Sequence, residues 1–76
     1  MSVDVNAILE LMVAELDLDE GEIEPTSTMD EVENWDSLGH LRVCMALEAA
    51  HGVKIPMEKV PELVSVPAIV AFLENT

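Results

Sequence analysis

The chain has 76 residues, of which 50% are hydrophobic and 3% are aromatic, and its formal net charge is −13 at pH 7. This length allows one domain, spanning residues 1–76, and the hydrophobic content is too high for a disordered acidic tail. The charge excludes nucleic acids and anionic membranes as partners, because both attract clustered Lys and Arg, and it favours proteins with basic patches.

Cysteine content and hydropathy indicate the compartment. Cys44 is the only cysteine, so no internal disulfide can form, and one Cys with two distant His does not make a metal cluster. The N-terminus lacks the basic start and apolar run of a signal peptide, and the longest apolar run, residues 66–73, is too short to span a bilayer. We therefore expect a soluble, cytoplasmic monomer without a metal, and a Cys44 that serves as a small core residue.

The first predicted helix covers residues 3–16, where Ile8, Met12 and Leu16 form an apolar stripe spaced by four residues. An acidic stretch with Gly21 and Pro25 follows it. Residues 20–35 show no clean period, so we expect a long ordered loop here. Four apolar side chains are expected to attach this loop to the core: Ile23, Met29, Val32 and Trp35.

The second predicted helix begins at Asp36-Ser37 and ends near Ala50, because Gly52 suits the position after a helix end. We expect one face of this helix to be buried. That face would consist of Leu38, Leu41, Cys44 and Met45, with Leu47 beside it.

Two further helices are predicted near the C-terminus. A short one is expected to open at residues 56–59 and to be limited by Pro61. A final one would be capped by Ser65 and tolerate Pro67 in its first turn. The pattern of Val66, Ile69, Val70 and Leu73 supports the final helix. The predicted fold is therefore all-α: a small antiparallel four-helix bundle with three main helices, a short third helix and a long loop between helices one and two.

Ser37 follows Asp36 at the predicted junction between the loop and the second helix. The first amides of a helix are unsatisfied and its dipole is positive there, so a phosphate ester on this hydroxyl would gain about 0.3–1 kcal/mol. Leu38 and Leu41 are expected to pack inward and hold the hydroxyl outward. The same Asp-Ser pair also fits an ordinary helix N-cap, so these residues alone leave both interpretations open.

Several stretches resemble the acyl carrier protein family, the phosphopantetheine-binding carriers. They are Trp35-Asp36-Ser37-Leu38-Gly39-His40-Leu41, Met45-Ala46-Leu47-Glu48, His51-Gly52-Val53-Lys54-Ile55-Pro56 and the Ser-Val start of the last helix. The resemblance implies a protein without enzymatic activity. A transferase that uses coenzyme A and Mg²⁺ would attach 4′-phosphopantetheine to Ser37, with Asp36 aiding recognition and Leu38 serving partly as a contact. The arm would carry acyl, aminoacyl or polyketide intermediates as thioesters, and the apolar interior could shelter a carried chain.

Some residues depart from the commonest fatty-acid pattern of that family. Trp35 replaces a small residue, Arg42 stands where an acidic residue is frequent, His51 replaces an aromatic core residue, and a Leu-Gly pair is missing upstream. These departures favour a dedicated carrier in a specialised pathway, such as polyketide, peptide or modified-acyl assembly. An aminoacyl or peptidyl carrier, and an acidic helical interaction module without an arm, remain the alternatives.

The resemblance also implies a docking surface for a phosphopantetheinyl transferase, for acyl- or aminoacyl-loading enzymes and for ketosynthase- or condensation-type enzymes with basic patches. We expect this surface to contain Trp35, Gly39, His40, Arg42, Glu48, Glu58 and Glu62, together with Asp30, Glu31 and Glu33 in the loop.

Three local features have simpler explanations than catalysis or metal binding. His40 lies one turn after Ser37, but without a third group to orient it we expect a partner-facing surface residue rather than a catalytic base. Gly39 is either tolerated slack in the helix or clearance for the arm or a docking enzyme. An EF-hand is excluded, because Leu16 and Ser27 would occupy its first and twelfth positions, which leaves only loose cation binding for the acidic run Asp17, Asp19, Glu20, Glu22 and Glu24.

Overall fold

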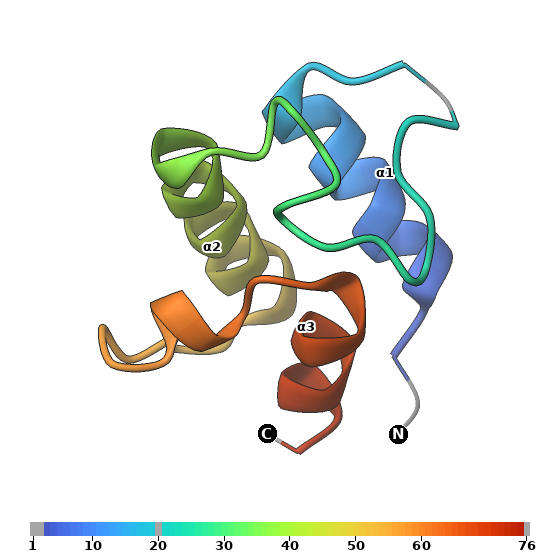
Figure 1. Cartoon of the computed structure of the whole chain (residues 1–76). Helices are drawn as coiled ribbons and strands as arrows, with labels where there is room; N and C mark the ends of the chain where they lie inside the picture. The colour runs from blue at the N-terminus through green and yellow to red at the C-terminus, as the bar shows by residue number, and fades with distance from the viewer. Residues whose placement is uncertain (1–2, 20, 76) are drawn as a thin grey trace.

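The computed structural model describes residues 3–19 and 21–75. Within them it contains α1 (Val5–Leu16), α2 (Ser37–His51), the 3-10 helix η1 (Val60–Glu62) and α3 (Val66–Glu74) (Figure 1). The all-α class is therefore confirmed. The predicted position of the short helix is wrong: residues 57–59 form turns, and the helical turn begins at Val60 with Pro61 inside it. Proline fits there because the first residues of a helix have no intrahelical use for their N–H groups.

Helix α1 confirms the predicted apolar stripe. Ile8, Met12 and Leu16 are all buried, and α1 packs along α2. The helix begins two residues later than expected because Asp4 is its N-cap, with a side-chain oxygen 3.0 Å from the backbone N of Asn6. An N-cap residue itself lies outside the helical conformation.

The loop between α1 and α2 is held at several points. Its predicted first residue, Glu20, lies outside the described residues. Ile23, Val32 and Trp35 are buried as predicted, and Met29 is half-buried against the same core. The Asn34 side-chain amide donates to the carbonyl oxygen of Leu16 at 3.3 Å.

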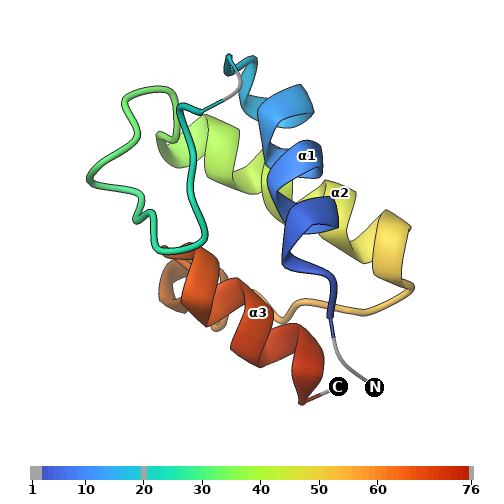
Figure 2. The ribbon, with the colours of Figure 1, turned by 90° about the vertical axis from the view of Figure 1, so that its right-hand side faces the viewer.

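Two backbone hydrogen bonds connect the loop to the start of α3. The Met29 amide donates to the Val64 carbonyl at 2.7 Å, and the Val66 amide donates to the Ser27 carbonyl at 2.9 Å. The loop therefore runs from the end of α1 down to α3 and back up to α2, as both views show (Figures 1 and 2). These contacts place the end of the loop, and with it the start of α2, at a defined position.

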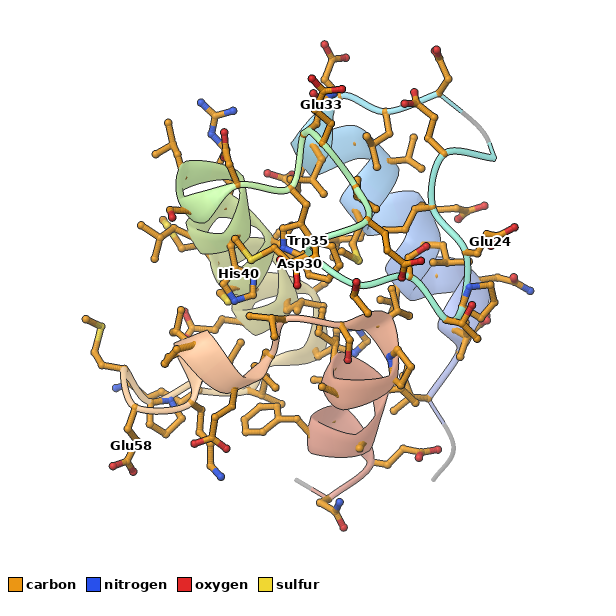
Figure 3. The ribbon with its side chains drawn as sticks, in the orientation of Figure 1. Glu24, Asp30, Glu33, Trp35, His40 and Glu58 are labelled. Carbon is orange, nitrogen blue, oxygen red and sulfur yellow. The ribbon has the colours of Figure 1, made fainter. Side chains whose placement is uncertain are left out.

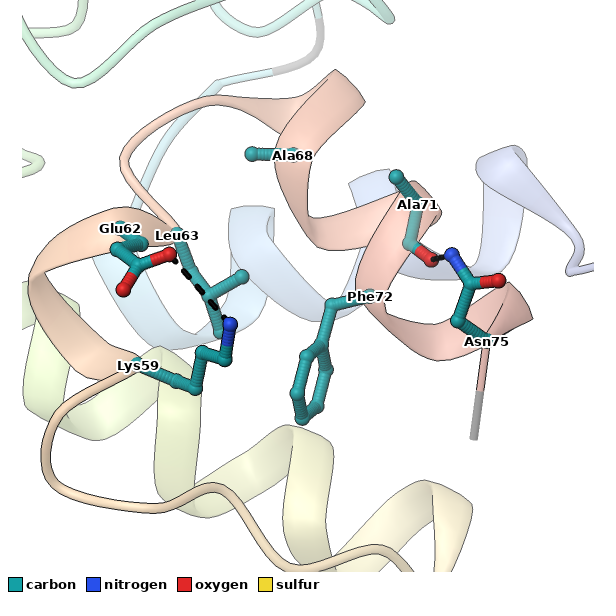
Figure 4. A pocket seen from close by; sticks show the side chains of 7 residues that line it. All are labelled: Lys59, Glu62, Leu63, Ala68, Ala71, Phe72 and Asn75. Atoms are coloured by element: carbon teal, nitrogen blue, oxygen red, sulfur yellow. Dashed lines mark hydrogen bonds and ion pairs between the residues drawn. The ribbon is translucent and has the colours of Figure 1, made fainter.

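Helix α3 begins as the sequence predicts. The Ser65 hydroxyl accepts from the Ala68 amide at 3.1 Å, Pro67 lies in the first turn, and Val66, Ile69 and Leu73 are buried. A hollow of about 470 Å³ lies between α3 and the η1 segment (Figure 4). Lys59 and Glu62 form an exposed ion pair at 3.5 Å on its border.

Candidate functional site

The junction of the loop with α2 is built by Asp36. Its side-chain oxygen accepts from the Gly39 amide at 2.8 Å, and its backbone oxygen accepts from the His40 amide at 2.7 Å. Asp36 is therefore the N-cap, and Ser37 is the first residue of the helix. Since the cap is supplied by Asp36, the hydroxyl of Ser37 is not needed for capping.

Ser37 differs from the other serines that the structure describes. The hydroxyl of Ser27 accepts from the Glu24 amide at 2.8 Å, and the hydroxyl of Ser65 caps α3. The Ser37 side chain is exposed and forms no hydrogen bond with any residue of 3–19 or 21–75. Of these three hydroxyls, the one at the start of α2 is open to a visiting enzyme.

The predicted buried face of α2 is wrong in most of its members. Leu38, Leu41 and Met45 are 62%, 47% and 68% exposed, whereas Cys44 is buried as expected. Leu38, Leu41 and Met45 share one face of the helix, but that face points to solvent. The face turned toward α1, the loop and η1 consists of Gly39, His40, Val43, Cys44 and Leu47. The Ser37 hydroxyl is thus not held outward by two buried leucines, and its position follows from the Asp36 cap.

An apolar groove of about 460 Å³ lies beside Ser37, between α2 and the segment that contains η1. Met57 and Val64, both exposed, belong to this groove, and the sequence pattern did not single out either of them. No periodicity marks Met57, because it lies in a turn. The groove is lined by Met29, Ser37, His40, Leu41, Met57, Val60, Pro61 and Val64.

Trp35 and His40 are not docking residues on the surface. They are 1% and 4% exposed, and their rings meet with centroids 5.9 Å apart in the middle of the molecule (Figure 3). The indole N–H of Trp35 donates to Nδ1 of His40 at 2.9 Å, and Nε2 of His40 lies 2.6 Å from the carbonyl oxygen of Val60. Both polar side chains are buried because each of their nitrogens has a partner.

Gly39 is also buried, and its role is close packing rather than slack or clearance for a partner. A Cβ atom there would lie 2.7 Å from Cδ2 of Leu16 and 2.9 Å from the carbonyl oxygen of Asn34. The absence of a side chain therefore lets α2 approach both the end of α1 and the loop.

The charged residues of the predicted docking surface have different environments. Arg42 is exposed beside a polar hollow that also contains Glu33 and Asp36, while Glu48 is half-buried and accepts from the Ile55 amide at 2.8 Å. Glu33 and Glu58 point outward at separate edges of the molecule (Figure 3). The remaining acidic members, Asp30, Glu31 and Glu62, are exposed, with Glu31 accepting from the Thr28 amide and Glu62 paired with Lys59.

His51 and Cys44 on α2 differ in their exposure. His51 does not replace a core residue, because it is exposed at the end of α2 before Gly52, whose φ of 63° ends the helix as predicted. Cys44 is the buried small residue that was expected. Burial, aided by the nearby negative charge of Glu48, raises the pKa of its thiol.

Within residues 3–19 and 21–75, no three or more His, Cys, Asp or Glu side chains are grouped closely enough to hold a metal ion. None of the helices there combines the length and apolar character needed to cross a membrane.

Comparison with known proteins gives a family match and curated relatives. The family described as "Phosphopantetheine attachment site" matches residues 6–73. A curated acyl carrier protein of Helicobacter hepaticus is 34% identical over 64 residues, which cover 84% of each of the two chains.

Proposed function

The chain belongs to the acyl carrier protein family, whose members are carriers and not enzymes, and we propose that Ser37 receives its covalently attached 4′-phosphopantetheine. The observation that carries this proposal is the contrast among the described serines. The hydroxyls of Ser27 and Ser65 are engaged with backbone amides, whereas that of Ser37 is exposed and has no hydrogen-bond partner within residues 3–19 and 21–75. When bound, the arm supplies a terminal thiol that holds an acyl cargo as a thioester.

The start of α2 fits the phosphate of such an arm. Asp36 accepts from the amides of Gly39 and His40, so the first two amides of the helix, those of Ser37 and Leu38, have no acceptor among the described residues. Both are close in sequence to the hydroxyl, and the positive end of the helix dipole contributes about 0.3–1 kcal/mol toward an anion.

The groove beside Ser37 supports an acyl cargo. Its lining is apolar apart from Ser37 and His40, and a hydrocarbon chain gains about 0.8 kcal/mol for each CH₂ group that it buries. Acyl or polyketide-type intermediates of a specialised pathway are the proposed cargo. Trp35 and Arg42, which depart from the common fatty-acid pattern of the family, support the specialised pathway.

Partner enzymes would dock on the exposed face of α2. Leu38, Leu41 and Met45 form an apolar stripe, and exposed apolar patches mark interaction sites. Glu58 and Glu62 lie on the segment across the groove, so partners with apolar pockets and basic borders would fit. Arg42 on α2 would instead face an acidic group of the partner. A phosphopantetheinyl transferase and enzymes that load or condense acyl groups are the proposed partners.

Attachment at Ser37 is tested by incubating the full chain with coenzyme A, Mg²⁺ and a phosphopantetheinyl transferase of broad specificity. Intact-mass spectrometry should show one added phosphopantetheine on the wild type and none on Ser37→Ala. Thr26→Ala is the matched control, because Thr26 is another exposed hydroxyl residue. Addition to the Ser37→Ala chain would contradict the proposal, and an unmodified wild type would favour an interaction module without an arm.

The nature of the cargo requires a second assay. The holo protein is offered to acyl-loading and to amino-acid-activating enzymes, and the mass of the loaded arm is measured. We expect acyl loading, and exclusive aminoacyl loading would identify the chain as an aminoacyl or peptidyl carrier instead.

A further inference from the structure

The two walls of the groove beside Ser37 are connected by His40. One wall is formed by α2, and the other by the segment that includes η1. The carbonyl oxygen of Val60 accepts from His40 Nε2 at 2.6 Å and from the Leu63 amide at 3.3 Å. Within residues 3–19 and 21–75, no other side-chain hydrogen bond joins α2 to η1.

The neighbours of His40 determine where its proton lies. An indole N–H can only donate, so Nδ1 of His40 must accept from Trp35. The ring proton is therefore on Nε2, which donates to Val60. The ring is neutral in this arrangement, and it relays one chain of hydrogen bonds from the loop through α2 to η1.

The η1 turn itself, residues 60–62, has few hydrogen bonds to hold it in place. A single 3-10 turn is weakly stable by itself, and Pro61 lacks an N–H group. Among the described residues, its other hydrogen bonds are local, from the Glu62 amide to Lys59 and from the Leu63 amide to Val60. The flanking residues are held separately, Val64 by the Met29 amide and Ile55 by Glu48. The position of this turn therefore depends on its contacts with α2 and α3, and the His40 bond is the directional one.

We propose that His40 is a positioning residue: through Nε2 it holds η1 against α2 and thereby sets the width of the groove beside Ser37. The positioning of η1 by His40 does not depend on the proposed function. Its consequence does rest on the proposed function: His40 would limit the size of the group that can lie next to the arm. A carried group that needs a wider groove has to displace the Val60 carbonyl from Nε2.

Two conservative substitutions test the roles of the two ring nitrogens of His40 separately. The side-chain amide nitrogen of His40→Gln can take the place of Nε2 and keep the donor to Val60, but it loses the acceptor for Trp35. The side-chain oxygen of His40→Asn can take the place of Nδ1 and keep that acceptor, but it is too short to reach Val60. The pair therefore tests which hydrogen bond positions η1.

The measurement is amide hydrogen exchange on the full chain without its arm. The amides of Glu62 and Leu63 report on η1, and that of Met12 in α1 reports on the whole fold. In His40→Asn we expect exchange at Glu62 and Leu63 to accelerate about fivefold relative to Met12, as one net hydrogen bond allows, and about twofold or less in His40→Gln. Equal acceleration at all three amides in both variants, or a Gln variant as fast as the Asn variant, would overturn the proposal.

A measurement on the wild type keeps the proposal falsifiable if the variants do not fold. Nitrogen NMR of the His40 ring should show an unprotonated Nδ1 and a protonated Nε2, and the opposite tautomer would overturn the proposal. Both measurements are made without the arm, so they can fail while attachment at Ser37 succeeds, or succeed while attachment fails.

Discussion

The two faces of α2 do not divide into polar and apolar as those of a simple amphipathic helix do, because both carry apolar side chains. The face toward solvent presents the large apolar side chains Leu38, Leu41 and Met45, while the face toward the core includes a histidine and a glycine. The buried histidine is stable because both ring nitrogens are paired, and the exposed apolar residues lie next to the proposed attachment site. One face of this helix therefore serves the fold, whereas the other is open to solvent and is the proposed docking face.

The largest expected effect is on the free energy of unfolding, and it differs between two leucines that lie on opposite faces of α2. Leu47 is fully buried, so Leu47→Ala should lower the free energy of unfolding by about 2–5 kcal/mol, which is most of the stability of so small a domain. Leu41→Ala should change it by less than about 1 kcal/mol, because nearly half of that side chain is already exposed. Urea denaturation followed by circular dichroism measures both values.

Leu41 is expected to matter more for partner binding than for stability. Leu41→Ala should lower kcat/KM for phosphopantetheinyl transfer several-fold, as truncation of an interface residue does, while the fold stays intact. Asn6→Ala on the exposed side of α1 is the control and should leave this rate unchanged. A folded Leu41→Ala chain with unchanged kcat/KM would show that Leu41 is not part of a docking surface.

A smaller effect is expected at Gly39. In a helix, replacing Gly by Ala normally stabilises by about 1 kcal/mol. Here the new Cβ would overlap Leu16 and the backbone of Asn34, so Gly39→Ala should instead destabilise by about 1–3 kcal/mol. The reverse change on the exposed face, Ala49→Gly, should cost only about 1 kcal/mol. Greater stability of Gly39→Ala would mean that α2 is not closely packed on the loop.

The smallest effect concerns Cys44 on the buried face. Burial raises the pKa of its thiol above the value in the unfolded chain. The unfolded chain therefore releases this proton first, so the stability that depends on Cys44 is complete below about pH 8 and is lost as the pH rises further. Between pH 7 and pH 10, the free energy of unfolding should fall more for the wild type than for Cys44→Val. Iodoacetamide should also modify the native chain more slowly than the urea-unfolded chain, and equal rates would contradict the raised pKa.

The elements that could be predicted are those whose causes lie within a few residues. The stripe of Ile8, Met12 and Leu16, the cap of α3 by Ser65, and the start of α2 at Asp36-Ser37 all follow from local spacing and capping chemistry. The short helix lies later than local spacing predicts, because Pro61 is accommodated in the first turn of η1 instead of ending a helix before it.

The amino-acid sequence by itself determined the helical class, the position of Ser37 at a helix start and the resemblance to its family, since motif and capping residues are close together along the chain. Tertiary structure alone decided which face of α2 is buried, and with it the roles of His40, Gly39 and Trp35. Both faces of α2 are apolar enough to form a core, so periodicity could not distinguish them. The choice depends on contacts with distant residues, such as Val60 opposite His40 and Leu16 opposite Gly39, which come together only in the folded chain.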